Sequence, residues 1–265
     1  MKKYILTLTA FLVTTLSYAG ITLEGSTTVL PLAQKAAEVY MDANPKADIS
    51  IRGGGSGVGI NSLIVGTVDI ANSSREIKSA EIEKAKEKNI YPQENIVAMD
   101  AIALVINPSN KVSNLTKQQV KDIFTGKIKN WKEVGGDNKK IVVVSRDSAS
   151  GTFEAFNELA LDKEKVRKDA LMQASNQGVA AIISTTPGAI GYVGLGYITS
   201  KTKALSIDSV QPSVETVLAG KYAYSRPLYM YTNGSPKGET KALLDFINSA
   251  GGQKIAKELG FVPLK

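Results

Sequence analysis

Short apolar stretches of strand length alternate with segments of helical periodicity along most of the chain. Residues 21–23 predict a strand, apolar residues recur at helical spacing through 30–41, and 49–51 predicts the next strand. This alternation is typical of an α/β fold, in which helices cover the faces of a sheet. Further strands are predicted near 68–70, 141–144, 190–193 and 228–231, and further helices at 60–64, 79–89, 115–124, 153–160 and 179–183, with a helix pair over 242–256 broken at Gly251 and Gly252.

Two longer segments predict that the fold is divided into two lobes. The apolar run 96–106 is too long for an ordinary strand, and 222–232 is a second long candidate. We expect both segments to cross between the lobes as hinge strands, so that the chain begins and ends in the same lobe. The expected boundaries place residues 20–101 and 229–265 in lobe I and residues 102–228 in lobe II.

The first residues have the pattern of an export signal. Lys2 and Lys3 supply positive charge, 5–16 is an apolar stretch diluted by Thr, and 17–19 has the small–x–small form of a cleavage site. A membrane anchor is the alternative, but the stretch is short for a bilayer span of about 20 residues. We therefore expect residues 1–19 to be a signal peptide and the mature protein to be periplasmic.

The chain contains neither Cys nor His. Without Cys there is no disulfide, thiol chemistry or Cys-linked lipid anchor, and without His there is no Ser-His-Asp triad or His-ligated zinc site. The net charge is +7, but the Lys residues are scattered over predicted helix faces without interleaved aromatic residues. This distribution argues against nucleic acid as a partner, while a mild positive field favours the approach of a small anion.

Four loops rich in Ser, Thr and Gly follow predicted strands, and three of them lead directly into predicted helices. The carboxyl ends of strands are where α/β proteins bind ligands. A helix N-terminus offers N–H donors and partial positive charge there, Ser and Thr add hydroxyl donors, and Gly lets the backbone approach closely. The four loops are 25–28, 53–59, 72–75 and 145–152.

Together these loops predict a cage of neutral donors around a tetrahedral oxyanion, with Arg146 as a charged clamp. For a single loop the alternative is helix capping, because Ser26, Thr28 or Ser150 could serve as an N-cap. The glycine run around Ser56 fits neither the dinucleotide nor the P-loop pattern, and it does not fit the nucleophile pattern Gly-x-Ser-x-Gly.

The order of these motifs resembles that of one protein family. Residues 25–31 read GSTTVLP, GGGSG follows at 53–57, DIANSSR stands at 69–75, and RDSASGT stands at 146–152. A further phrase, LTKQQVKDIFTGKIKNW at 115–131, is characteristic of the same family, although its residues have the pattern of packed structure. Over essentially its whole mature length, the chain resembles the periplasmic phosphate-binding proteins of ABC-type phosphate uptake systems.

The resemblance implies a two-lobed periplasmic binding protein fold that closes around one phosphate ion without metal, cofactor or covalent step. It also implies a monomer that is not an enzyme and that hands phosphate to an ABC permease in the inner membrane. Carried over by position, the expected phosphate-binding residues are Ser26, Thr27, Thr28, Ser56, Gly57, Ser74, Arg146, Ser150, Gly151 and Thr152.

Ser74 departs from the family pattern. Well-known members have an Asp here, which accepts the proton of hydrogen phosphate and so rejects sulfate, an ion that carries none. Ser74 can accept a hydrogen bond but can also donate one, which weakens the expected preference for phosphate. Glu24, Glu76 and Asp147 are candidate replacement acceptors, and Arg75 is expected to brace the loop, with ligand contact as the alternative.

Three other functions stay open on the sequence. The same fold could bind sulfate, molybdate, tungstate or arsenate, and Ser74 keeps this alternative open. A secreted hydrolase or phosphatase with a Ser nucleophile is the second, which the absence of His and Cys disfavours. The third is an adhesion or surface-interaction protein that keeps the fold and binds no anion.

Overall fold

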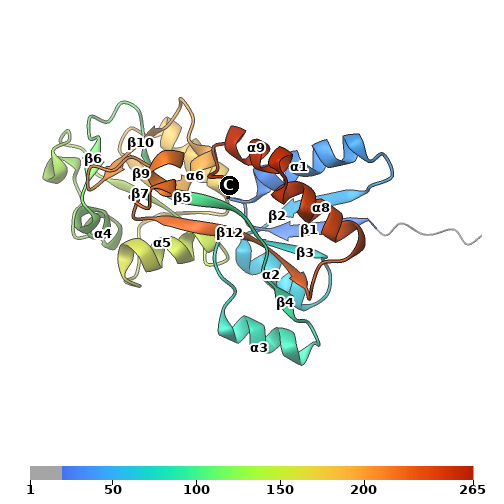
Figure 1. Cartoon of the computed structure of the whole chain (residues 1–265). Helices are drawn as coiled ribbons and strands as arrows, with labels where there is room; N and C mark the ends of the chain where they lie inside the picture. Colours follow the sequence, from blue (N-terminus) through green and yellow to red (C-terminus); the bar gives the residue numbers. More distant parts are fainter. Residues whose placement is uncertain (1–19, 265) are drawn as a thin grey trace, which may run out of the picture.

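The computed structural model describes residues 20–264, and Figure 1 shows two groups of helices and strands joined by long strands. The signal peptide predicted for residues 1–19 lies outside the described residues and stays a prediction. Between residues 20 and 264, no helix combines the length and apolar character that a membrane span requires.

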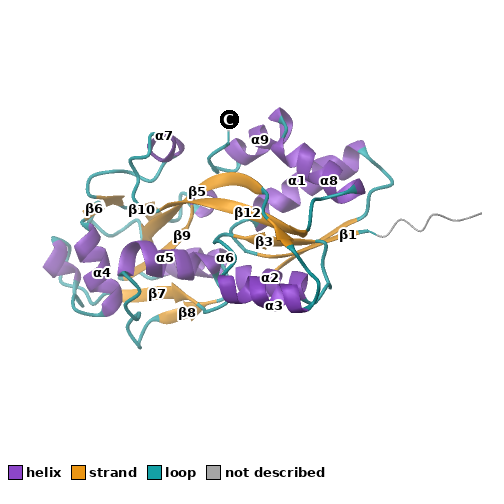
Figure 2. Ribbon diagram, turned by 60° about the horizontal axis from the view of Figure 1, so that its bottom comes forward, coloured by secondary structure: helices purple, strands orange, loops and turns teal. Residues whose placement is uncertain are grey.

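The first group, which we name lobe I, is a sheet with helices on both faces. Strand β1 pairs in parallel with β2 and β3, so that Leu23 lies opposite Ile51 on one side and Ile70 on the other. Helices α1, α8 and α9 cover one face of this sheet and α2 lies on the other (Figure 2). The elements of lobe I are β1 (Ile21–Gly25), α1 (Leu30–Ala43), β2 (Ile49–Gly53), α2 (Ser56–Ile64), β3 (Ile70–Ser73), α3 (Ser79–Glu87), β4 (Pro92–Gln93), α8 (Gly238–Asn248) and α9 (Ala250–Glu258).

The second group, lobe II, is built around the parallel pair β7 and β9. Tyr192 of β9 stacks on Phe156 of α5 with ring centroids 4.1 Å apart, and Phe124 of α4 packs edge-on against Phe156 at 4.7 Å. These buried rings fix α5 against the sheet. The elements of lobe II are β6 (Asn114–Leu115), α4 (Lys117–Thr125), η1 (Trp131–Val134), β7 (Val142–Arg146), α5 (Gly151–Leu161), β8 (Leu171–Gln173), α6 (Asn176–Thr185), β9 (Ala189–Gly194), η2 (Leu195–Tyr197), β10 (Lys203–Ala204), β11 (Ser206–Ile207) and α7 (Val214–Leu218).

Two long strands, β5 (Ile96–Ile106) and β12 (Ser225–Asn233), belong to both lobes. Strand β12 pairs antiparallel with β3 in lobe I, and β5 pairs antiparallel with β9 in lobe II. The two strands also pair with each other between these points. One sheet path therefore runs through both lobes, and the predicted α/β fold with two crossing strands is confirmed.

The predicted break in the C-terminal helix pair is wrong. The break falls at Ser249, whose hydroxyl accepts the N–H of Gly252 at 3.3 Å and caps α9. Gly251 and Gly252 lie inside α9. A side chain at Gly252 would collide with the carbonyl of Ile247. Glycine at this position therefore lets α9 pack closely against the end of α8.

The helix predicted at 115–124 begins later than expected. Leu115 pairs with Ile207 in a two-stranded sheet, and α4 starts only at Lys117. Thr116 is its N-cap and accepts the N–H of Gln119 at 3.1 Å, which fixes the start of the helix. Periodicity also failed to predict the two- and three-residue strands of the fold, which are too short to show a period.

Candidate functional site

The loops that follow β1 and β7 meet between the two lobes. The hydroxyl oxygens of Thr28, before α1, and Thr152, in the first turn of α5, are 2.8 Å apart. The guanidinium of Arg146, at the end of β7, donates from Nη2 to Thr27 Oγ1 at 3.2 Å. All four side chains are buried. The structure thus brings predicted site residues from both lobes into direct contact.

The glycine run and the loop after β3 form another side of this polar cluster. Ser56 Oγ lies 3.3 Å from Ser74 Oγ and accepts the N–H of Ser74 at 3.0 Å. A Cβ on Gly151 would collide with the Ser56 hydroxyl, and Gly57 donates its N–H to the carbonyl of Ala149 at 3.0 Å. Glycine at position 151 therefore lets the two lobes approach closely, whereas a Cβ at position 57 would make only ordinary contacts with Ala149.

Two of the predicted site residues also make local hydrogen bonds. Ser150 is the N-cap of α5, and its hydroxyl accepts the N–H of Phe153 at 3.1 Å. Ser26 Oγ accepts the N–H of Thr28 at 3.1 Å, whereas the N-cap of α1 is Val29, which makes no side-chain bond. Both hydroxyls still carry a proton to donate, so capping and anion binding are compatible in the same loop.

Arg146 is buried without a carboxylate partner among residues 20–264. It is 1% exposed, and it donates from Nε to the carbonyl of Gln173 at 3.0 Å and from Nη2 to that of Ala174 at 2.9 Å. Its Nη1 has no hydrogen-bond partner among the residues described, and every other Arg of the chain forms an ion pair. Burial lowers the pKa of Arg146, and the charge of Arg226 acts in the same direction. The guanidinium therefore leaves an uncompensated positive charge beside the hydroxyls.

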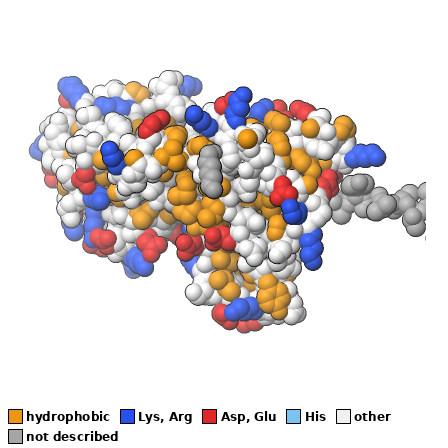
Figure 3. Space-filling view, in the orientation of Figure 1, with side chains coloured by type: hydrophobic (Ala, Val, Ile, Leu, Met, Phe, Trp, Pro, Cys, Tyr) orange, Lys and Arg blue, Asp and Glu red, His pale blue; other side chains and the backbone are white. Residues whose placement is uncertain are grey.

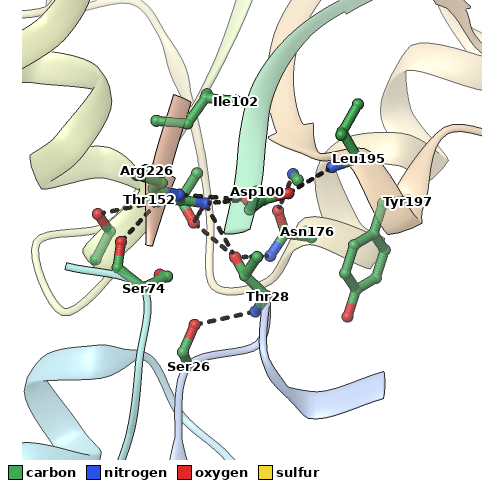
Figure 4. Close-up of polar contacts among 12 residues, drawn as sticks. Ser26, Thr28, Ser74, Asp100, Ile102, Thr152, Asn176, Leu195, Tyr197 and Arg226 are labelled. Carbon is green, nitrogen blue, oxygen red and sulfur yellow. Dashed lines mark hydrogen bonds and ion pairs between the residues drawn. The ribbon is translucent and has the colours of Figure 1, made fainter. Parts of the chain in front are cut away.

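An ion pair between the two crossing strands adjoins the hydroxyls (Figure 4). Arg226 Nη2, from β12, lies 3.0 Å from Asp100 Oδ2 of β5 and donates to Thr152 Oγ1 at 3.1 Å. Asp100 Oδ1 accepts the N–H of Leu195 at 3.0 Å, and Arg226 Nη1 donates to the carbonyl of Ser74 at 3.0 Å. Burial raises the pKa of Asp100 and lowers the pKa of Arg226, and their attraction opposes both shifts. The pair thus ties the crossing strands to loops of both lobes.

Sequence reasoning missed this pair and also missed Asn176, the first residue of α6. Asn176 Nδ2 donates to the hydroxyl oxygens of Thr27 and Thr28, at 3.0 Å in each case. One signal for the pair was present, because a single Asp inside the apolar run 96–106 needs a buried cation nearby. No comparable signal marks Asn176, since Asn near a helix start is common.

The three carboxylates suggested as replacement proton acceptors are engaged elsewhere. Glu24 accepts a hydroxyl of α2, Glu76 accepts the hydroxyl of Tyr229 at 3.4 Å, and Asp147 accepts the N–H of Ala149 at 3.0 Å. Among residues 20–264, Asp100 is the only acidic residue classed as buried. Asp100 is thus the buried carboxylate nearest to this role, and it is linked to the hydroxyl of Thr152 through Arg226, which contacts both groups.

The chemistry of the cluster suits an anion and not a metal ion. Its members are hydroxyls, one amide and a guanidinium, which supply hydrogen-bond donors. Within the part of the chain that the structure describes, no group of three or more Asp, Glu, His or Cys side chains is placed to hold a metal. Neutral donors with one charged clamp are able to bind an oxyanion without covalent chemistry.

Comparison with known sequences identifies the family. The family model for the PBP superfamily domain matches residues 13–250. The phosphate-binding protein PstS of Bacillus subtilis is 39% identical over 247 residues, which cover 92% of this chain and 81% of that protein. The chain belongs to the PstS family. The PstS of Borreliella burgdorferi is 35% identical over 259 residues, which cover 92% of this chain and 90% of that protein.

Solved structures of PstS-like proteins have the same fold. A phosphate ABC transporter substrate-binding protein with bound phosphate, from Clostridium perfringens, matches with a TM-score of 0.88 at 33% identity and covers 93% of this chain and 100% of that one. An ABC-type phosphate transport receptor from Vibrio cholerae matches with a TM-score of 0.74 at 31% identity, over 91% of this chain and 99% of that one. The two-lobed binding-protein fold predicted from the sequence is therefore confirmed.

Proposed function

We propose that this PstS family member binds inorganic phosphate between its lobes and delivers it to an ABC permease in the inner membrane. The observation that carries the proposal is the buried guanidinium of Arg146, which has no carboxylate partner in the part of the chain that the structure describes and lies among hydroxyl donors from both lobes. A divalent anion at this point would compensate the charge and accept the hydroxyl protons. The names of the relatives support phosphate as that anion.

The proposed binding residues combine three kinds of donor. Arg146 supplies charge, the Ser and Thr hydroxyls supply neutral donors, and the first turns of α2 and α5 supply N–H groups that have no partner within their helices. No metal, cofactor or covalent step is needed. The N–H of Gly57 is already donated to the carbonyl of Ala149, so Gly57 would line the site without donating to the anion. The proposed set is Ser26, Thr27, Thr28, Ser56, Gly57, Ser74, Arg146, Ser150, Gly151 and Thr152.

The protein is proposed to act as a monomeric periplasmic receptor and not as an enzyme. Residues 1–19 would direct export, and residues 20–101 with 229–265 would move against 102–228 about β5 and β12. On the face drawn in Figure 3, Lys and Arg are interspersed with Asp and Glu, so this face presents no continuous basic surface of the kind that nucleic acid binds. The absence of His and Cys from the sequence supports binding over hydrolysis.

Phosphate is expected to raise the melting temperature of the mature, ligand-stripped protein much more than sulfate or molybdate. A ligand that binds only the native state, at about 1,000 times its Kd, adds about 4 kcal/mol to the free energy of unfolding. For a chain of this size that corresponds to a rise of roughly 8–16 °C. Differential scanning calorimetry with each anion in turn measures the shift.

The same experiment separates the alternatives. Equal shifts with phosphate and sulfate would assign the protein to oxyanions in general. No shift with any anion would support the surface-interaction protein instead. Steady turnover of a phosphate ester that disappears in Ser150→Ala would support the secreted hydrolase.

Ser74→Asp is expected to sharpen the preference for phosphate over sulfate by at least about tenfold in the ratio of Kd values, or about 1.4 kcal/mol. A buried carboxylate accepts the proton of hydrogen phosphate but faces sulfate with no proton between two charges. Isothermal titration calorimetry with both anions gives the ratio. Ser74→Asn is the matched control, because it has the shape of Asp without the charge. An unchanged ratio in Ser74→Asp would remove position 74 from selectivity.

A further inference from the structure

Arg75 follows Ser74 in the loop after β3, and the structure places it away from the hydroxyl cluster. Its side chain is 7% exposed. Nη1 donates to Glu81 Oε2 at 2.8 Å and Nη2 donates to Glu81 Oε1 at 2.7 Å, a bidentate contact that ties the guanidinium to α3. Burial alone would raise the pKa of Glu81, but the bonds from Arg75 and from the Lys78 N–H lower it on balance. Arg75 is therefore a fixed part of lobe I.

The remaining edge of this guanidinium faces the other lobe. Glu154 lies in the first turn of α5, two residues after Thr152. Its Oε2 is 2.9 Å from Arg75 Nε and 2.8 Å from Lys78 Nζ. The Arg75 contact lies outside hydrogen-bond geometry, so it is an ion pair only. One carboxylate oxygen of lobe II thus contacts two cations of lobe I.

We propose that Glu154, Arg75 and Lys78 form an interlobe latch that sets how much of the ligand-free protein is closed, and thereby sets the affinity for the anion. This inference rests on the proposed function, because it describes how the same cleft closes. None of the three residues belongs to the proposed binding set. Their contact energy is available only when the lobes meet, since Arg75 and Lys78 lie on lobe I and Glu154 lies on lobe II.

The effect on affinity follows from the closure equilibrium. When the closed state is the binding-competent one, the apparent Kd equals the intrinsic Kd divided by the closed fraction. Opening the lobes would separate Glu154 from both cations and leave the 7% exposed Arg75 with Glu81 as its remaining carboxylate. The latch therefore stabilises the closed state and slows release of the ligand, without touching it.

Solvent reaches the latch, so its strength should depend on salt. A pocket of about 530 Å³ is lined by residues of both lobes and of β12, among them Arg75, Lys78, Glu154 and Pro227. The Lys78 side chain is 54% exposed. Salt screens contacts between charges that water can reach more than contacts between buried charges. Part of the salt dependence of anion affinity should consequently disappear when the latch is removed.

The test compares Glu154→Gln with the wild-type mature protein in phosphate titrations and stopped-flow dissociation. We expect the Kd for phosphate to rise about tenfold, mainly because phosphate dissociates faster. The Kd should also depend less on NaCl concentration than in the wild type. Glu158→Gln is the matched control, because it removes the same charge from the same helix, where Glu158 is 66% exposed and, among residues 20–264, forms an ion pair only with Lys163. It should leave the Kd and dissociation rate unchanged.

A second measurement reports closure itself. The chain contains no Cys, so cysteines introduced at Lys84 in lobe I and Lys168 in lobe II can be labelled uniquely with nitroxides. Without ligand, Glu154→Gln should shift the distance distribution between the labels away from the closed distance. With saturating phosphate, both proteins should show the same closed distance. A merely structural role for Glu154 would not produce this ligand-reversible shift.

The outcomes separate the latch from the proposed function. If the wild type does not bind phosphate, the proposed function fails, while the distance distributions of the ligand-free proteins still test the latch. If phosphate binds and Glu154→Gln leaves the Kd unchanged, the latch is overturned. A raised Kd with an unchanged distance distribution would also overturn it, because Glu154 would then act locally within α5 and not on lobe closure. Lys78→Gln combined with Glu154→Gln should raise the Kd less than the product of the two single effects.

Discussion

Arg226→Ala is expected to lower the free energy of unfolding by about 3–5 kcal/mol, the cost of leaving one partner of a buried ion pair alone. Asp100 is fully buried and would lose the cation that lies 3.0 Å from it. The carbonyl of Ser74 and the hydroxyl of Thr152 would also lose a donor. For a chain of this size the melting temperature should fall by roughly 6–20 °C.

The pH dependence of this loss identifies its cause. Burial raises the pKa of Asp100 and Arg226 counteracts part of that rise, so removing Arg226 raises the pKa further. The folded variant then holds a proton that the unfolded chain releases at an ordinary Asp pKa of about 3.9. Because the folded state binds more protons, stability falls as the pH rises between these two pKa values. The deficit relative to the wild type should therefore shrink in acid and be largest near neutral pH.

Thermal and urea unfolding between pH 4 and pH 8 measure both effects, with the ligand removed throughout. The control is Lys241→Ala, which breaks the exposed pair between Lys241 and Asp245 and should cost less than about 1 kcal/mol. A loss of similar size in Arg226→Ala would show that the Asp100 pair is not a principal support of the crossing strands. A large loss without pH dependence would assign the effect to the hydrogen bonds of Arg226 and not to the charge of Asp100.

The loops of the site could be predicted from the sequence because their signals are local. A strand followed by Ser, Thr or Gly and then a helix can be recognised in a dozen residues, and parallel strands place such loops at one edge of a sheet. Thr27, Ser56 and Ser150 each lie in such a segment. The two lobes followed from the length of the apolar run 96–106.

The lone Asp100 signals a buried cation, but which residues contact one another behind the loops could not be predicted, because the partners are distant in sequence. Asp100 and Arg226 are 126 residues apart, and Asn176 is 149 residues from Thr27. Asp100 also stands in a strand whose other residues are all apolar, so the strand has the pattern of core. The break between α8 and α9 lies where a side chain caps the second helix. Ser249 supplies that cap, and the two glycines lie inside α9.

Arg146→Ala is expected to abolish high-affinity phosphate binding and yet leave the ligand-free protein about as stable as before. Loss of a buried, charged contact to the anion should cost about 2–5 kcal/mol of binding, which raises Kd by roughly 30-fold to several thousand-fold. In the absence of ligand, the substitution removes a buried charge that has no carboxylate partner. Removing this charge should favour the folded state, which offsets the loss of the three hydrogen bonds to Thr27, Gln173 and Ala174.

Isothermal titration calorimetry measures the affinity, and melting without ligand measures the stability. Arg146→Lys keeps the charge without the planar fork and should bind phosphate with intermediate affinity. Unchanged affinity in Arg146→Ala would place the anion elsewhere.

The contrast with Arg226 is the sharper criterion, because both guanidiniums are buried within hydrogen-bond reach of the same hydroxyl cluster. Arg226 pairs with Asp100 inside the protein, so Arg226→Ala should mainly lower the free energy of unfolding. Arg146 has no such partner among residues 20–264, so Arg146→Ala should mainly raise the Kd for phosphate. Equal destabilisation by the two substitutions would show that Arg146 is structural.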